Sequence, residues 1–418
     1  MKNIKFKILF ISSDKFPPFR VDVAVLFGKE ISGRGHIVDW ILQSEENCDK
    51  SYMTKMPGGQ VLVGATDNGP SRWHRLTKHI YSIINDLSMF RMAARNKYDF
   101  IQVKDKFLSA LFAIVAAKKN HTKFIYWLSY PFPEASIYRA KEGTARYPLF
   151  YLIRGYIFKF FLYRVILPAA DHIFVQSEQM LKDVAAEGIS LEKLTAVPMG
   201  VETDKIPFKL DGNALQPEKK QKIVLYLGTL AKIRKIDFLI RVFSFVLNQE
   251  PSAKLYLVGA GDDPTDEQLI VDEAKRLGIS DSIIMTGFLP MEKAWEFVRQ
   301  ADVCVSPFHP TVILNSTSPT KLIEYMAMGK AVVANDHPEQ RLVLEESSAG
   351  LCVRYDEDAF SSAIVYLLQN PHKASEMGIR GRRYVAQYRS YKAIADTVDQ
   401  KYQQVLKGSN RSQGSDRQ

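Results

Sequence analysis

The sequence predicts an α/β protein with two Rossmann-like domains, and three observations support this prediction. Short apolar runs alternate with helical patterns along the 418 residues, and this alternation occurs twice. A polar, proline-containing stretch without clear periodicity, residues 201–222, separates the two series. The composition, 46% hydrophobic and 24% charged, is that of a globular chain long enough for two cores. We therefore expect two parallel sheets, each covered by helices on both faces.

The first domain is expected over residues 1–200, followed by a linker at 201–222. Helical patterns, among them 22–34 and 107–119, separate five runs that read as buried strands: KILFISS, IVDWIL, DFIQVK, KFIYWLS and HIFVQS.

The second domain is expected over residues 223–385 and repeats the theme. Its strands read KIVLYLG, KLYLVGAG, SIIMTGF, DVCVSPF and KAVVAN, and its helices lie near 236–249, 264–277, 291–300 and 319–328. The tail at 407–418 has few apolar residues and is predicted to be disordered.

Cysteine use and charge restrict the compartment and the partners. Cys48, Cys304 and Cys352 are far apart and form no CxxC pair, which favours a reducing compartment over a disulfide scaffold or zinc ribbon. The apolar run Ile8–Ile11 is too short for a signal peptide, and no apolar stretch approaches the ~20 residues of a membrane span. We expect a cytoplasmic protein. Its net charge of +10 points to a nucleotide, a phosphorylated lipid, a membrane surface or nucleic acid.

Glycines follow successive strands in the second half of the chain. Gly228, Gly259 with Gly261, and Gly287 each come directly after an apolar run, and Arg234 lies in the loop after the first of these. Ligands of parallel sheets bind beyond the carboxyl ends of the strands, where glycine lets a ligand approach the backbone closely. The pattern predicts a ligand site at these ends.

The stretch STSPTKLIEYMAMGKAVVA, residues 316–334, predicts a helix that begins at an anion site. Ser318 suits the N-cap and Pro319 the first helical position. Lys321 then lies in the first turn, where the helix dipole disfavours a cation unless a phosphate binds there. Glu324, one turn on, would accept hydrogen bonds from a ribose diol. These residues fit a sugar nucleotide; the alternative is that Lys321 only pairs with Glu324 or water.

Five motifs of the second half occur in a familiar order: YLGTLAKIRKIDFLI, LVGAGD, TGFLP, ADVCVSPF and SPTKLIEYMAMGKAVVA, preceded by FVQSEQM and VPMGVE. With these motifs the chain resembles, over nearly its whole length, the retaining GT-B glycosyltransferases of the family 4 type. The resemblance implies a GT-B fold, in which two Rossmann-like domains face each other across a cleft. It also implies a helix at 386–406 that crosses back to the first domain.

The resemblance implies roles for residues of the second domain. Arg234 would hold the donor diphosphate, Glu324 the donor ribose, and Lys321 would lie beside the phosphates, which makes these three the expected catalytic residues. The other donor-binding residues would be Gly228, Thr229, Gly261, Phe288, Pro290, Ser318, Pro319 and Thr320. No metal or cofactor is expected, because cationic side chains and a helix N-terminus would stabilise the leaving diphosphate.

Three positions depart from the family's pattern. Ser316 replaces the first of the family's paired glutamates, Thr229 replaces an arginine of many members, and Ser129 replaces a histidine that often ends a strand. The resemblance therefore does not specify the donor sugar.

Three residues of the first domain are candidates for the acceptor side. Arg20 lies in the first strand–helix loop, and Asp105 and Glu134 follow later strands, positions at which binding residues are common. The alternative for the two carboxylates is that they are helix caps.

The stretch RYPLFYLIRGYIFKFFLYRVILP, residues 146–168, is rich in aromatic residues, and its four charges are all basic. At 100° per residue these four charges do not share one face. One hypothesis is a buried helix whose basic ends reach solvent. The other is shallow docking on the cytoplasmic face of an anionic membrane, near a lipid-linked acceptor.

The resemblance thus implies a retaining, metal-independent glycosyltransferase. We expect it to move a hexose from a nucleotide sugar to a glycan or lipid-linked acceptor in polysaccharide or glycoconjugate synthesis. A nucleotide-sugar epimerase or a sugar phosphorylase of the same fold is the alternative. A nicotinamide dehydrogenase would need GxGxxG, and VGAGDD has only the first two glycines. A nucleic-acid partner would explain the charge but not the glycines at strand ends, so none is expected.

Overall fold

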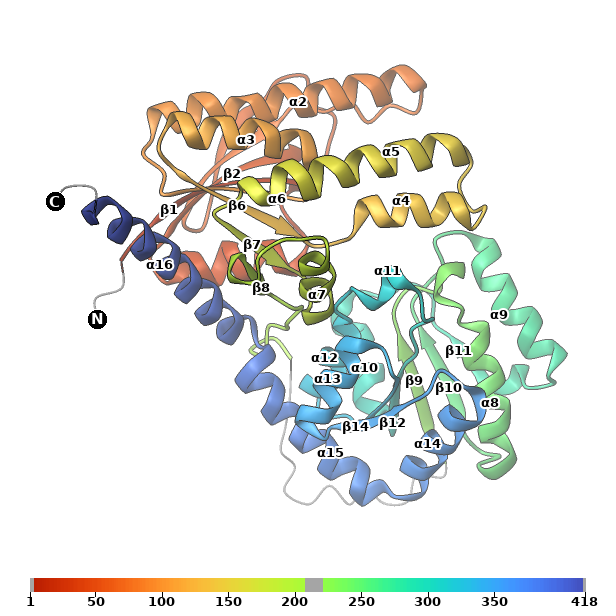
Figure 1. The fold of residues 1–418 in the computed structure, drawn as a ribbon. Coiled ribbons are helices and arrows are strands. Elements are labelled where there is room, and N and C mark those ends of the chain that lie inside the picture. Colours follow the sequence, from red (N-terminus) through yellow and green to blue (C-terminus); the bar gives the residue numbers. More distant parts are fainter. Residues whose placement is uncertain (1–3, 207–220, 416–418) are drawn as a thin grey trace. The chain divides into compact units, whose positions relative to one another are not determined.

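The computed structural model describes residues 4–206 and 221–415, and the chain divides into two compact units (Figure 1). Residues 1–198 and 391–418 form the first unit, and residues 199–390 form the second. Each unit is built on its own sheet, as the two series of strands predicted.

The first unit is centred on an eight-stranded sheet of order β3-β4-β2-β1-β5-β6-β7-β8. All neighbours pair in parallel except β3 and β4, an antiparallel hairpin that was not predicted. The strands are β1 (Lys7–Phe16), β2 (Ile37–Ser44), β3 (Tyr52–Met56), β4 (Gly59–Gly64), β5 (Phe100–Lys104), β6 (Lys123–Leu128), β7 (His172–Val175) and β8 (Leu194–Ala196).

Helices cover both faces of this sheet, and a separate apolar core lies on each face. One core packs Ile101 of β5 against α2 and α3, and the other packs Phe10 of β1 against η1 and α16. The helices are α1 (Val21–Ala24), η1 (Leu26–Ile31), α2 (Arg72–Arg95), α3 (Phe107–Lys119), α4 (Phe132–Lys141), α5 (Pro148–Phe161), η2 (Leu162–Ile166), α6 (Leu167–Ala169), α7 (Glu178–Ala186), η3 (Leu191–Lys193) and α16 (Tyr391–Ser415).

The second unit is centred on a six-stranded, all-parallel sheet of order β11-β10-β9-β12-β13-β14. Its strands are β9 (Ile223–Leu227), β10 (Lys254–Val258), β11 (Ile283–Met285), β12 (Val303–Ser306), β13 (Val332–Asn335) and β14 (Gly350–Val353). Its helices are η4 (Lys232–Arg234), α8 (Asp237–Gln249), α9 (Pro264–Arg276), η5 (Ser280–Ser282), α10 (Met291–Gln300), α11 (Val312–Asn315), α12 (Thr320–Ala327), α13 (Pro338–Ser347), α14 (Glu357–Gln369), α15 (Pro371–Tyr384) and η6 (Val385–Arg389). Two apolar cores lie on the two faces of the sheet.

The unit boundaries differ from those expected at 200, 222 and 385. The Val201 N–H donates to the Arg389 carbonyl (3.0 Å) and Val201 packs in the second unit's core, so the residues from 199 to 206 belong to that unit. The rest of the expected linker, 207–220, lies outside the described residues. Helix α16 packs on the first unit through Tyr391, Val398 and Tyr402.

The tail prediction was wrong for residues 407–415, because α16 continues to Ser415. A helix that has already formed gains one backbone hydrogen bond for each added residue, and this stretch contains no proline. Residues 416–418 lie outside the described residues. Among the helices in the described ranges, none has both the length and the apolar composition of a membrane span.

Candidate functional site

Three strand-end loops of the second unit meet because they carry glycine. Gly228 follows β9 and Gly259 follows β10, and both have a φ of 143°. A Cβ atom on Gly259 would lie 2.1 Å from the Gly228 carbonyl oxygen, a distance that no side chain tolerates. Gly259 also forms a bridge with Gly287, which follows β11. The glycine pattern thus marks one edge of the sheet, as predicted.

Lys321 lies in the first turn of α12 against the end of β9. Its Nζ is 3.9 Å from the centroid of the Tyr226 ring and 5.3 Å from that of the Phe308 ring. A Cβ atom on Gly228 would lie 3.2 Å from this Nζ. The ammonium therefore packs on aromatic faces at the strand exits, and such a contact is worth roughly 0.5–2 kcal/mol.

Arg234 shares the Phe308 ring with Lys321. Its guanidinium carbon is 5.4 Å from the ring centroid, and it comes from η4, directly before α8. Phe308 is held after β12 by a pair of hydrogen bonds, in which its N–H donates to Asn335 Oδ1 (2.7 Å) and its carbonyl accepts from Asn335 Nδ2 (2.9 Å). One buried ring thus brings two cations from distant parts of the chain together.

Burial and the neighbouring charges shift the pKa values of Lys321 and Glu324. Burial lowers the pKa of Lys321 well below its usual range, the positive charge of Arg234 lowers it further, and Glu324 acts in the opposite direction. Burial raises the pKa of Glu324 to about 7, opposed by Lys321. An anion bound between Lys321 and Arg234 would favour the charged ammonium.

The start of α12 differs from the prediction. Pro319, with φ −70° and ψ 107°, is the N-cap, Thr320 is the first helical residue, and no described side chain caps the helix. Ser318 is not the N-cap, because its Oγ accepts a hydrogen bond from the Met199 N–H (3.0 Å). The first-turn N–H groups, the anion-binding feature of a helix, thus remain without a side-chain cap.

The residues expected around a nucleoside lie in the loops after β9, β10 and β11. The Thr229 carbonyl accepts from the Tyr226 hydroxyl (3.1 Å). The Gly261 N–H already donates to Glu267 Oε1 (3.0 Å), so it belongs to the α9 entry rather than to a free loop. Phe288 is 83% exposed, and Pro290 is the N-cap of α10.

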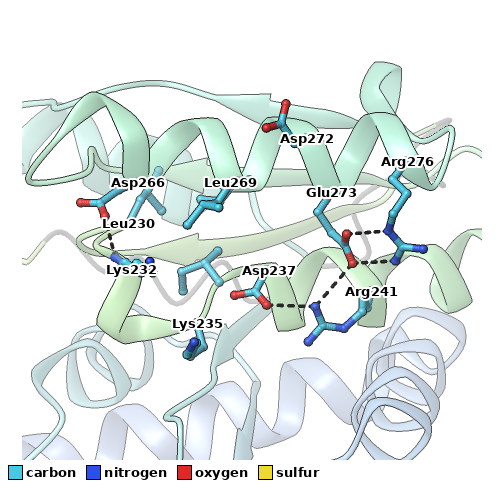
Figure 2. A pocket seen from close by; sticks show the side chains of 12 residues that line it. Leu230, Lys232, Lys235, Asp237, Arg241, Asp266, Leu269, Asp272, Glu273 and Arg276 are labelled. Carbon is cyan, nitrogen blue, oxygen red and sulfur yellow. Dashed lines mark hydrogen bonds and ion pairs between the residues drawn. The ribbon is translucent and has the colours of Figure 1, made fainter. Parts of the chain in front are cut away.

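A separate cavity of about 370 Å³ lies between η4, α8 and α9. Figure 2 shows that ion pairs cross it: Arg241 bonds Asp237 (2.9 Å) and lies 3.4 Å from Glu273, which also binds Arg276 (2.7 Å). The lining includes none of the three expected catalytic residues. The cavity is therefore distinct from the Lys321–Arg234 cluster. Its basic and acidic side chains are equal in number, so it has no excess of either charge.

The first unit gathers buried charges at the ends of β1 and β5. Arg20 donates twice to Asp22 (3.1 Å each), and Lys104 Nζ reaches Asp22 Oδ2 at 2.7 Å. Asp105, with φ +57°, accepts hydrogen bonds from the N–H and the hydroxyl of Ser129. Burial raises the pKa of Asp105, and the positive charges of Lys104 and Arg20 oppose this. The structure thus brings Arg20 and Asp105 together.

Glu134 belongs to a different group of residues, in α4. Its Oε1 lies 3.9 Å from Lys159 of α5, which pairs more closely with Glu187 (2.6 Å). Burial raises the pKa of Glu134. This carboxylate contacts the helices that follow β6, whereas Arg20 and Asp105 lie at strand ends.

The hypothesis of a buried helix with solvated basic ends is wrong for the helix itself, since Gly155 is the one described residue of α5 that is buried, whereas Arg146 and Arg164, at the ends of the stretch, are exposed as expected. Arg154 donates to Ser136 Oγ (3.2 Å) and lies 4.6 Å from the Tyr151 ring centroid, and Lys159 is ion-paired. The outward residues are instead apolar: Leu149, Phe150, Ile153, Tyr156, Ile157 and Phe160. The two cations within α5, Arg154 and Lys159, thus contact neighbouring protein groups, and the exposed face of the helix is apolar.

Tyr226, Asp22 and Lys104 belong to these clusters but were not predicted as site residues. Lys104 could have been found, since a lysine that ends the apolar run DFIQVK needs a buried acidic partner. Tyr226 gave no such signal, because an aromatic residue in a central strand reads as ordinary core.

Two family models match the chain: Glycosyltransferase Family 4 over residues 23–205 and Glycosyl transferases group 1 over residues 221–370. Among curated proteins, alpha-monoglucosyldiacylglycerol synthase of Streptococcus pneumoniae is 25% identical over 303 residues, 68% of this chain. The match spans 63% of that relative, less than two thirds of its length.

Solved structures share the fold over nearly the whole chain. Sucrose-phosphate synthase from Thermosynechococcus elongatus has a TM-score of 0.70 at 20% identity, covering 97% of this chain and 100% of that one. HepE of Anabaena, solved with UDP and glucose, has a TM-score of 0.64 at 13% identity, covering 95% and 99%. The predicted fold class, GT-B with two Rossmann-like domains, is confirmed.

Proposed function

Because the chain belongs to the group 1 glycosyltransferases of the family 4 type, we propose that it transfers a hexose from a nucleotide sugar to a glycan or lipid-linked acceptor. Two likenesses support the substrate classes. HepE was solved with UDP and glucose, and the S. pneumoniae relative is named for a glucosylated diacylglycerol. The product belongs to polysaccharide or glycoconjugate synthesis.

The observation that carries the proposal is the pair of cations on one aromatic ring. Lys321 and Arg234 both lie within 5.4 Å of the Phe308 ring centroid, beside Gly228 and the uncapped start of α12. A diphosphate between them would receive two charge-assisted contacts and first-turn N–H groups, including those of Thr320 and Lys321. Glu324, on the same helix, would accept from the ribose hydroxyls.

This arrangement supplies what a retaining transfer needs from the protein. As the bond between the sugar and the diphosphate breaks, negative charge grows on the leaving phosphate, and Lys321 and Arg234 stabilise it there. The sugar passes through an oxocarbenium-like state, and the leaving phosphate takes the acceptor's proton. Since protein cations meet the developing charge, transfer should proceed without a divalent metal, and its rate should be the same with and without EDTA.

The acceptor side is proposed for the Arg20–Asp105 cluster of the first unit, and the exposed apolar face of α5 for shallow contact with the cytoplasmic leaflet. Arg20 is fixed by Asp22 and is still partly exposed, so it can meet an anionic acceptor group. Glu134 remains a weaker part of this proposal, because it already interacts with Lys159.

The proposal is tested by incubating the protein with UDP-, GDP- and ADP-sugars and a membrane extract, with product detection by mass spectrometry. A glycosylated acceptor whose anomeric configuration matches that of the donor supports it. Conversion of the donor to its epimer without an acceptor would indicate an epimerase. Breakdown of the glycosylated substrate that requires inorganic phosphate would indicate a phosphorylase.

A further inference from the structure

Helix α2 carries apolar residues on two opposite faces. Its inner face packs Met89, Met92 and Ala93 into the first unit's core. A second row lies exposed: Trp73, Leu76, Ile80, Ile83, Ile84 and Leu87, called here the outer stripe. Its spacing of three and four residues places all six within about 100° of arc, roughly opposite the inner face. Figure 1 shows α2 as a long orange helix beside α3.

The outer stripe is not explained by packing within the unit. No described side chain from Trp73 to Ile84 is buried, and Trp73 itself is 76% exposed. A helix on the surface of a globular protein normally shows polar residues to solvent. Six large apolar side chains in one row therefore indicate a surface that another apolar phase covers.

The charge around the outer stripe selects the partner. Residues 71–164 carry 17 Lys and Arg against five Asp and Glu, whereas the rest of the chain carries 39 against 41. The whole positive excess thus lies in the segment that contains α2 and α5. The one acidic residue of α2, Asp86, is buried and bonded to Lys106 and Ser109. Helix α2 itself carries the exposed cations Lys78, Arg91 and Arg95 and no exposed acidic residue. An apolar row flanked by such cations fits the interface of an anionic bilayer.

We propose that α2 is a membrane-binding helix, which lies along the surface of an anionic bilayer with the outer stripe at the acyl boundary and its cations at the headgroups. A second copy of the chain would fit less well, because two equally cationic surfaces would face each other. With the apolar face of α5, the first unit then has two helices that contact lipid. The proposal concerns binding alone and does not depend on the transfer reaction.

Trp73 reports on α2 directly. Of the four tryptophans, Trp40 and Trp127 are buried in the first unit and Trp295 is partly buried in the second. Adding vesicles of phosphatidylglycerol and phosphatidylcholine, without donor or acceptor, should shift Trp73 emission to shorter wavelength, and brominated lipid should quench it. Trp73→Phe should abolish the shift. Vesicles of phosphatidylcholine alone, or a rise in salt from about 0.1 to about 0.5 M, should reduce it.

Ile80→Glu with Ile84→Glu should weaken sedimentation with anionic vesicles by about tenfold or more. The matched control is Leu191→Glu, at an exposed apolar residue of η3 in the same unit, which should sediment like the wild type. Both variants should keep the wild-type circular dichroism, since the changed residues are exposed.

Unchanged Trp73 emission on anionic vesicles, or wild-type sedimentation of the double variant, overturns the proposal. So does a wild-type dimer without vesicles that the double variant converts to a monomer, because the outer stripe would then be a protein interface. Failure of the transferase assay leaves these readouts intact, so the two proposals fail separately.

Discussion

At the scale of single residues, the unusual feature is a lysine whose ammonium is placed on aromatic rings instead of on a carboxylate. Lys321 lies 3.9 Å from the Tyr226 ring centroid, and burial and Arg234 both disfavour its charged form. A bound anion would favour the charged form of Lys321, so the side chain should contribute more to anion affinity than to the stability of the free protein. The site residues are therefore better judged by what happens to donor affinity than by their effect on stability.

Arg234→Ala and Glu324→Ala are each expected to abolish transfer while the fold stays intact. Loss of a charge-assisted contact should cost roughly 1.5–3 kcal/mol of donor binding, about tenfold or more in affinity. Calorimetric titration with the nucleotide and a transfer assay measure the two effects. Lys232→Ala, which removes an exposed cation of the same η4 turn, is the control. Near-normal activity of a well-folded Arg234 or Glu324 variant would place the donor elsewhere.

His337 should make the second unit sensitive to acid. Burial lowers its pKa to about 4, while its Nε2 donates to the Leu314 carbonyl at 2.7 Å. The unfolded chain therefore binds the extra proton first, so the stability that neutral His337 contributes is complete above about pH 6.5 and is lost as the pH falls toward 4.

The expected loss in unfolding free energy from this histidine is about 3 kcal/mol between pH 7 and pH 4. Urea titrations over this range measure it, and His337→Gln should show a flatter pH dependence than the wild type. The exposed His372→Gln serves as the comparison. Parallel pH profiles for wild type and His337→Gln would show that the histidine does not control the acid response.

At the scale of elements, the strand exits were predictable and the contacts between distant elements were not. Glycines after apolar runs located the edge where β9, β10 and β11 end. The β3–β4 hairpin was missed although Met56-Pro57-Gly58-Gly59 carries an ordinary turn signal. Ser318 was assigned as a helix cap by local rules, but its hydroxyl is used by Met199, far away in sequence. Local patterns contain no information on such partners.

The exit of β5 depends on a buried ion pair. Lys104 and Asp22 have side chains only 2% and 3% exposed, and their atoms lie 2.7 Å apart. Lys104→Met should therefore remove the closest positive charge from the buried Asp22 carboxylate. The unfolding free energy should fall by about 3–5 kcal/mol, measured by urea denaturation. The exposed Lys97→Met should cost little by comparison. An equal effect of both substitutions would show that the pair contributes nothing specific.

At the scale of the whole molecule, donor recognition and charge are assigned to different units. All expected donor residues lie in the second unit, whereas the positive excess lies in residues 71–164 of the first. Binding of a nucleotide and binding of a membrane are thus expected to be separable properties of one chain.

Hydrogen exchange should show this separation. Adding UDP should slow amide exchange around residues 226–236 and 306–324 of the second unit, because ligand binding suppresses local opening. Lys321→Ala should remove that protection. Protection confined to residues 14–22 and 104–106 would instead assign the nucleotide to the first unit.

The bridge between Val201 and Ser390 shows how the second unit is inserted into the chain. The second unit is one uninterrupted segment of the chain, 199–390, whose two ends leave it side by side. The chain is therefore organised as a host domain with a cassette inserted near its last helix, α16. Exchanging this cassette between relatives requires only two junctions, which already meet in space. On the proposed assignment of the donor to the second unit, such an exchange should transfer donor preference while the first unit stays unchanged.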